Sequence, residues 1–280
     1  MDRFVPTSAR FSAACLALVV AACATVADRG PPGLTTEQIA AIVASPDRSA
    51  GDRTNDLRRK PAETLAFIGV RPGMTVLDVS AGGGYTSELL ARSVGPTGRV
   101  YGQSAPPDPN RAPPAAPEGS DAPKPATPPP PRRTSAMAIA ERARNPAASN
   151  LVSVLAPFSN PVPAELASQS FDLVTLMFNY HDFGHMGVDR ASMNRAIFGA
   201  LKPGGIYVVA DHAGRPGTGI SESGTLHRVE ADFVVREVEA AGFRLAERGV
   251  FLSNPNDPRD RNEPDPPTPK DEFVLKFVKP

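Results

Sequence analysis

Apolar runs of strand length alternate with segments of helical periodicity over most of the chain. Strands are predicted at Thr75–Val79, Arg99–Gly102, Leu151–Leu155, Phe171–Asn179, Ile206–Ala210, Arg244–Leu252 and Phe273–Val278, and helices at Tyr85–Ser93, Ser135–Arg144, Ala191–Leu201 and Glu230–Ala241. This alternation favours a mostly parallel sheet with helices on both faces. The last two strands lack a long crossover, so we expect an antiparallel hairpin there. The sequence therefore predicts a doubly wound, Rossmann-like α/β domain with seven strands.

Two shorter helices are predicted before the first strand. Thr35 begins a capping-box pattern ahead of Thr36–Ala44. Proline in the first turn and Gly69 at the exit favour a helix at Pro61–Ile68. We expect the basic run Arg58–Lys60 to be a solvated turn, or alternatively part of the cover of a ligand site.

The first residues have the pattern of an export signal. Arg3 and Arg10 precede the small and apolar run Phe11–Ala22, which is too short to span a bilayer as a helix. Val20–Ala22 followed by Cys23 resembles a bacterial lipobox. We therefore expect residues 1–22 to be a signal peptide, Cys23 to carry a lipid anchor, and the protein to lie in the periplasm or cell envelope. An ordinary secretory signal cleaved nearby is the alternative.

Segments rich in proline flank and interrupt the domain. Residues 23–34 have the composition of a tether, and the domain is predicted to occupy residues 35–280. Twelve of the 27 residues at 105–131 are proline, which predicts an extended, disordered insertion. The Pro/Asp/Arg-rich segment 254–270 is predicted to be a solvated loop of the same kind.

Composition excludes several classes of protein and site. Lys+Arg and Asp+Glu both number 30 and no long basic run occurs, so we expect no nucleic-acid partner. Cys15 and Cys23 both precede the domain, which excludes a disulfide or a cysteine metal ligand within it. The sequence predicts no oligomeric state.

A glycine-rich turn joins the first strand of the predicted sheet to its helix. Residues 78–85 read Asp-Val-Ser-Ala-Gly-Gly-Gly-Tyr. Glycines at such a turn let the backbone approach a ligand at the carboxyl edge of the sheet, beside a helix N-terminus. A tight turn without a ligand is the simpler alternative, which three consecutive glycines make less favourable. Ser80 and Tyr85 stand where the dinucleotide fingerprint requires glycine, so NAD and FAD are disfavoured.

The same turn carries a family resemblance. Asp78, Ser80, Gly82 and Gly84 have the spacing of the acid-x-Gly-x-Gly-x-Gly turn of class I S-adenosylmethionine-dependent methyltransferases, with serine replacing the first glycine. Phe171–Val174 is similar to the fourth-strand motif of that family, and Leu201–Gly205 to the approach to its fifth strand. The resemblance implies S-adenosylmethionine as cofactor and methyl transfer to an unknown small molecule or envelope component.

Further motifs resemble a narrower family, the predicted exported, lipoprotein-type methyltransferases. These motifs are Asn179–Asp182, Asp211–Gly217, Thr225–Arg228, Asn254–Pro255 and Phe273–Phe277. The resemblance covers Thr35 to the C-terminus, apart from the Pro-rich insertion.

The resemblance also implies which residues bind the cofactor. They are Asp78, Ser80, Ala81, Gly82, Gly83, Gly84, Tyr85, Gln103, Pro157, Phe158 and Asn179. One departure concerns the ribose, because these enzymes usually place an acid at the end of the second strand, where this chain has Gln103. An amide binds a hydroxyl more weakly than a carboxylate does. Pro157 and Phe158 provide an apolar edge for adenine.

The histidines His181, His185, His212 and His227 all follow the predicted fourth and fifth strands. Methyl transfer requires an aligned acceptor and, for OH or NH acceptors, proton removal, a task that suits histidine near neutral pH. We predict that His181 is the general base, that Asp182 or Asp211 orients an imidazole, that Tyr180 or Asn179 lines the acceptor pocket, and that His212 participates. A structural role for each histidine is the alternative.

The sequence is also compatible with two other functions. Six residues are of metal-ligating types, namely His181, Asp182, His185, Asp211, His212 and His227, but their spacing matches no specific metal motif, so no metal site is predicted. A non-catalytic binding lipoprotein on the same fold is the second hypothesis, since the ribose acid is missing and S-adenosylmethionine is made in another compartment. A metal-dependent hydrolytic or binding lipoprotein is the third and least favoured.

Overall fold

The computed structural model describes residues 1–2, 32–107, 133–263 and 268–280. The described residues from 32 onward form one compact unit. Residues 3–22 of the predicted signal peptide, the lipidation site and nearly all of the Pro-rich insertion lie outside the described residues. Within the described residues, no helix has both the length and the apolar character needed to cross a membrane.

Seven strands form one sheet in the order β3-β2-β1-β4-β5-β7-β6. The strands are β1 (Thr75–Val79), β2 (Arg99–Ser104), β3 (Leu151–Leu155), β4 (Phe171–Met177), β5 (Leu201–His212), β6 (Arg244–Gly249) and β7 (Glu272–Val278). Strands β1 to β5 pair in parallel, and β7 is antiparallel to both β5 and β6. The doubly wound α/β sheet and its antiparallel C-terminal pair are confirmed.

The strand order reverses at β1. The chain runs outward from β1 to β2 and β3 and then returns to β4 on the other side of β1. In open α/β sheets, ligands bind outside the carboxyl ends of the strands at such a switch point. The loops after β1 and β4 therefore define the edge where a site is expected.

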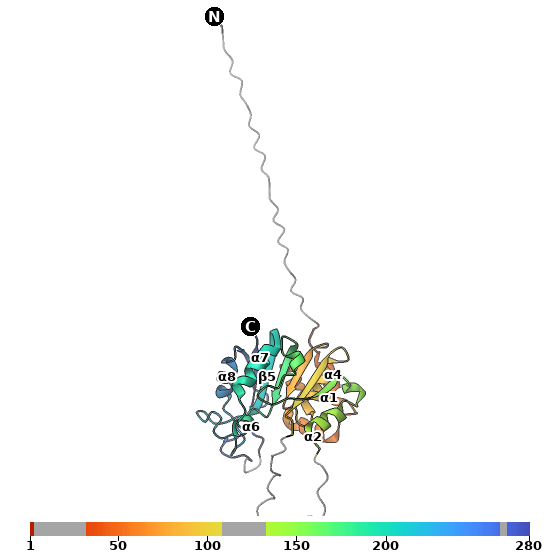
Figure 1. Cartoon of the computed structure of the whole chain (residues 1–280), viewed down its shortest axis with the longest axis vertical. Helices are drawn as coiled ribbons and strands as arrows, with labels where there is room; N and C mark the ends of the chain where they lie inside the picture. The colour runs from red at the N-terminus through yellow and green to blue at the C-terminus, as the bar shows by residue number, and fades with distance from the viewer. Residues whose placement is uncertain (3–31, 108–132, 264–267) are drawn as a thin grey trace, which may run out of the picture. The chain divides into compact units, whose positions relative to one another are not determined.

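Helices cover both faces of the sheet. They are α1 (Thr36–Ala44), α2 (Ala50–Arg59), α3 (Pro61–Ile68), α4 (Tyr85–Val94), α5 (Ser135–Arg142), α6 (Asp182–His185), α7 (Arg190–Ala200) and α8 (Ala231–Glu239), with short 3-10 turns at Pro146–Ala148 and Ala164–Leu166. Successive strand residues point to opposite faces. Val76 accordingly packs into the core that includes residues of α1, α3 and α4, and Leu77 into the core with α7 and α8. Figure 1 shows α1 and α4 beside the early strands, and α7 and α8 near β5.

Helix α2 was not predicted from the sequence. Its last turn contains Arg58 and Arg59, which were expected to lie in a solvated turn. The helix has one large apolar side chain, Leu57, and that side chain is 84% exposed, so the segment has no apolar periodicity. Ser49 caps its start by accepting a hydrogen bond from Asp52 N at 3.1 Å.

The described part of segment 254–270 is a largely exposed loop, as expected, but it also has an anchor that was not expected. Asp257 is buried there, 2.8 Å from the fully buried guanidinium of Arg228. It also accepts a hydrogen bond from Asp271 N at 2.6 Å. The content of proline and charged residues therefore did not reveal that Asp257 anchors this loop.

Candidate functional site

The glycine turn after β1 presents bare backbone at the carboxyl edge of the sheet. Ser80, Gly82 and Gly84 have left-handed φ angles of 54°, 53° and 79°. A Cβ placed on Gly83 would meet nothing within 4 Å. The turn is therefore open at Gly83, whereas Gly84 lies against the side chain of Arg142.

Asp78 supports this turn from within the sheet. Its carboxylate is 1% exposed and accepts hydrogen bonds from Ser87 Oγ at 2.6 Å and Thr175 Oγ1 at 2.7 Å. Burial raises the pKa of Asp78 to about 6, although both hydrogen bonds oppose that shift. In this arrangement Asp78 joins β1 to α4 and β4 and does not face a ligand.

Gln103 ties together the ends of three neighbouring strands. It is fully buried, accepts a hydrogen bond from Ser80 N at 2.9 Å and donates one to Ala156 O at 2.6 Å. Because the side chain is fully buried and bonded to backbone at both ends, this geometry does not support the predicted ribose contact. Ser104, the next residue, has a buried hydroxyl with no hydrogen-bond partner among the described residues. Its Oγ is therefore a polar group at the end of β2 that the sequence analysis missed.

The remaining predicted cofactor residues lie at the same edge. Asn179 follows β4 and donates a hydrogen bond from Nδ2 to Ser80 O at 3.2 Å, which links it directly to the glycine turn. Pro157 is exposed, and half-buried Phe158 packs on Phe183 with ring centroids 4.7 Å apart. An apolar surface of this kind suits a planar base.

A cleft of about 640 Å³ opens beside Gly82 and Gly83. It is lined by the loop between α1 and α2, by the start of α4 and by α5. A cavity of this size accommodates a small organic molecule. The open face of the turn therefore borders space for a ligand.

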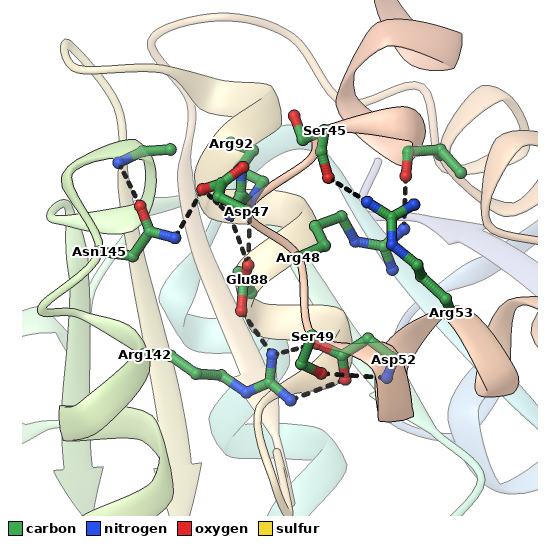
Figure 2. Close-up of polar contacts among 12 residues, drawn as sticks. Ser45, Asp47, Arg48, Ser49, Asp52, Arg53, Glu88, Arg92, Arg142 and Asn145 are labelled. Atoms are coloured by element: carbon green, nitrogen blue, oxygen red, sulfur yellow. Dashed lines mark hydrogen bonds and ion pairs between the residues drawn. The ribbon is translucent and has the colours of Figure 1, made fainter.

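A charged network locks α2, α4 and α5 around the turn (Figure 2). Arg142 donates from Nε to Gly83 O at 2.6 Å, and its terminal nitrogens reach both oxygens of Asp52 at 2.7 and 2.8 Å. The same guanidinium lies 2.5 Å from Glu88. Asp52 and Glu88 are both buried, so Arg142 neutralises two buried carboxylates while it holds the backbone of the turn.

The second half of α2 contacts residues on either side of the turn through Asp56 and Arg59. Asp56 accepts two hydrogen bonds from Arg48 and one from the hydroxyl of Tyr85 at 2.7 Å. The guanidinium of Arg59 lies 5.2 Å from the ring centroid of Tyr85 and 4.6 Å from that of Phe178. Its Nε is buried and has no hydrogen-bond partner among the described residues. This supports the alternative that the basic run helps to cover the site.

His181 lies in a buried carboxylate environment after β4. Its Nδ1 is 2.6 Å from Oδ1 of the fully buried Asp211, and its Nε2 is 3.2 Å from Asp182. Burial alone would lower the pKa of His181, but the bonds to Asp182 and Asp211 outweigh it and raise the pKa to about 9. The expected orienting role of Asp211 is consistent with this geometry. A protonated imidazole cannot act as a general base at neutral pH, so the pKa opposes that predicted role of His181.

Tyr180 points away from the carboxyl edge. It is fully buried, and its hydroxyl donates to Glu237 at 2.7 Å and accepts from Asn194 at 3.2 Å. Adjacent residues of an irregular segment face different directions, and the sequence could not separate them. The prediction that Tyr180 lines an acceptor pocket is therefore not supported.

His212 lies at the end of β5 beside His181, with ring centroids 5.5 Å apart. Its Nδ1 is 3.0 Å from Glu272 Oε1, yet among the described residues this buried nitrogen has no partner with hydrogen-bond geometry. Glu272 also binds Arg58 of α2 at 2.5 Å. His212 therefore lies beside the ring of His181 and is linked to α2 through Glu272 and Arg58.

His227 and His185 complete the group. The ring centroids of His181 and His227 are 5.6 Å apart, and those of His227 and His185 are 5.8 Å apart. His227 Nδ1 lies 3.4 Å from Asp182 Oδ1. All four histidines of the chain thus form one continuous cluster, which supports the predicted grouping.

Three of the six non-glycine residues with left-handed φ angles in the described part of the chain lie at this edge. Besides Ser80, Phe178 and His227 have φ angles of 66° and 51°, a conformation that costs free energy for residues other than glycine. Phe178 was not identified from the sequence because it falls within the predicted strand Phe171–Asn179, where an aromatic residue indicates a core position. Arg142 was missed as well, since nothing in a helix sequence reveals a carbonyl 59 positions away.

Comparisons with solved structures identify the fold. A SAM-dependent methyltransferase from Aquifex aeolicus is 16% identical, with a TM-score of 0.55 over 88% of this chain and 100% of that chain. An arsenic(III) S-adenosylmethionine methyltransferase from Chlamydomonas reinhardtii is 18% identical, with a TM-score of 0.51 over 89% of this chain and 74% of that one. The [4+2]-cyclase SpnF is 17% identical, with a TM-score of 0.52 over 82% of this chain and 81% of that one.

The chain therefore has the Rossmann-like fold of class I methyltransferases. No family model matches the sequence, and no curated protein matches it either. At such low identities the comparisons establish the fold, and function has to be argued from the site.

Proposed function

We propose that this protein is an S-adenosylmethionine-dependent methyltransferase that acts on a small molecule or a component of the cell envelope. The observation that carries the proposal is the open glycine turn at the carboxyl end of β1, beside a cleft of about 640 Å³. Methyltransferases are among the solved structures with the same fold, which supports this choice of cofactor.

The polar groups around the turn suit this cofactor. Gly82 and Gly83 would contact it through backbone, and the unpaired Ser104 hydroxyl at the end of β2 would hydrogen-bond its ribose. Arg59, with its unpartnered Nε, is a suitable partner for the cofactor's carboxylate. Phe158 provides an apolar surface for adenine.

Bound S-adenosylmethionine would supply an electrophilic methyl group. The chain's own task is then to align the acceptor and to stabilise charge. His181, whose ring is held by Asp211, lies at the edge where an acceptor would be aligned. Asp182, whose side chain is 30% exposed, lies where an acceptor would meet this group.

Transfer of a labelled methyl group tests the proposal. The purified protein is incubated with methyl-tritiated S-adenosylmethionine and fractionated cell-envelope and small-molecule extracts. We expect label in one fraction with the parent protein and none with Gly83→Gln, which projects a side chain from the open turn. The matched control is Gly51→Gln, because Gly51 is also exposed and a Cβ there meets only Ser49 Oγ, at 4.0 Å. Equal transfer by both variants would contradict the proposal.

A non-catalytic binding protein is the second candidate. It is favoured by the absence of a carboxylate at the end of β2, where Gln103 is buried and bonded to backbone. The [4+2]-cyclase SpnF has the same fold, so the fold by itself does not imply methyl transfer. Saturable binding of S-adenosylhomocysteine without transfer to any fraction would favour this candidate.

We further propose that the protein is exported and anchored by a lipid on Cys23. The apolar run before Cys23 and the absence of any other cysteine after residue 15 support this. Metabolic labelling with radioactive palmitate is expected to mark the parent protein and not Cys23→Ser. Labelling of both would contradict the lipobox assignment.

A further inference from the structure

We infer that His181, Asp182 and His227 form a binding site for one divalent transition-metal ion. One nitrogen or oxygen atom from each residue lies within 4.8 Å of the other two. His181 Nε2 and His227 Nδ1 are 3.2 and 3.4 Å from the same oxygen, Asp182 Oδ1. The three atoms therefore surround one point, as the ligands of a metal ion do.

A buried carboxylate fixes the ring of His181. This contact is independent of the short distances among His181, Asp182 and His227. Asp211 Oδ1 lies 2.6 Å from His181 Nδ1, and the backbone N–H groups of His181 and His212 donate to the same carboxylate at 2.7 Å. Asp211 is fully buried and cannot turn away. Nδ1 therefore holds a proton facing Asp211, and Nε2 is directed at Asp182. Histidines that bind metals usually donate their other ring N–H to a carboxylate in this way.

His227 is brought to the site by an anchored segment. Arg228, the next residue, is fully buried, pairs with Asp257 at 2.8 Å and donates to Ala213 O at 3.0 Å. The side chains of Asp182 and His227 are 30% and 40% exposed. An ion can therefore enter from solvent, and water can complete its coordination.

The ligand types determine the class of metal. Two imidazoles and one carboxylate form the set found in catalytic zinc sites and in non-haem iron sites, whereas Mg²⁺ and Ca²⁺ prefer oxygen ligands. Two carboxylates, Asp182 and Asp211, face imidazoles that are neutral when they ligate, and this negative balance suits a divalent cation. The set thus favours Zn²⁺ or a neighbouring first-row ion.

This inference does not depend on the proposed function. Asn179, two residues before His181, binds the glycine turn through Ser80 O, so the metal site lies along the same edge as the proposed cofactor site. Metal titration without S-adenosylmethionine tests the metal site alone, and cofactor titration after chelation tests the cofactor site alone.

Titration of the chelator-stripped full chain with Zn²⁺ and Co²⁺ tests the site, with calorimetry for stoichiometry and visible absorption for Co²⁺ coordination. We expect one ion per chain. Asp211→Asn is expected to weaken binding about 10- to 100-fold, as loss of such an orienting carboxylate does, and His227→Gln at least as much. His185→Gln is the matched control, since His185 is an exposed histidine of the same cluster outside the three converging residues, and it should retain the parent affinity.

Circular dichroism establishes that each variant is folded before titration. If His227→Gln does not fold, Asp182→Asn decides, because that side chain is partly exposed and the change keeps its shape. Absence of saturable binding by the folded parent would overturn the inference. Equal losses in His185→Gln and His227→Gln would overturn it as well.

Discussion

At the scale of single residues, Arg142 connects the stability of the domain to the shape of the glycine turn. It contacts two buried carboxylates and the carbonyl of Gly83. Arg142→Ala leaves the buried carboxylate of Asp52 without its ion-pair partner, whereas Glu88 keeps its pair with Arg92. The loss is expected to cost about 3–5 kcal/mol of the free energy of unfolding. Urea denaturation measures this cost.

Arg133→Ala is the control for Arg142→Ala. Arg133 pairs with Glu141, and the two side chains are 57% and 61% exposed, so its loss should cost less than about 1 kcal/mol. Equal destabilisation by the two substitutions would show that the Arg142 network contributes no more than a surface pair.

Asp78 gives the stability of the protein a dependence on pH. Its pKa is about 6 in the folded protein against an ordinary value of 3.8, because burial disfavours its charge. The folded state therefore binds a proton more tightly than the unfolded state does. The resulting cost is fully present above about pH 6 and disappears as the pH falls toward 3.8.

Asp78→Asn should remove this cost. We expect the variant to be more stable than the parent at about pH 8, by up to about 3 kcal/mol. The difference should shrink by about 1 kcal/mol at about pH 5. Denaturant unfolding of both proteins at the two pH values measures it. A difference that does not change with pH would indicate that Asp78 has an ordinary pKa.

At the scale of elements, β7 joins the end of the sheet to the rest. It lies between β5 and β6, and among the described strands β6 pairs only with β7. Ending the chain before Glu272 would leave β5 unpaired on one side and remove the only partner of β6. We expect such a truncation to lose cooperative unfolding in circular dichroism, whereas removal of the exposed Pro280 should have no effect.

The elements also show what the sequence could and could not predict. Helix α1 was predicted with correct bounds because its capping box and apolar spacing are local signals. Helix α2 was missed because ion pairs with distant residues hold it, and they replace an apolar face. The spacing Ser49-x-x-Asp52, with Ser49 as N-cap, was the one local signal for it. In the same way, the sequence grouped the histidines correctly but could not show that Tyr180 points toward Glu237.

At the scale of the whole molecule, the fold brings two kinds of chemistry to one edge of the sheet. The loop after β1 provides open backbone beside a cleft, and the loops after β4 and β5 provide the histidine cluster. Ser80, Phe178 and His227 hold strained backbone there. Strain of this kind is maintained where function requires it. The fold alone leaves the reaction open, because a methyltransferase fold also occurs in a cyclase.

Calorimetric titration of the purified protein with S-adenosylmethionine tests directly whether the glycine turn after β1 binds this cofactor. Gly83→Gln and Gly51→Gln are titrated in parallel. We expect saturable binding of one ligand per chain in the parent protein and in Gly51→Gln, and loss of binding in Gly83→Gln. Absence of binding to the folded parent at about millimolar ligand, which corresponds to less than about 4 kcal/mol of binding free energy, would contradict the account.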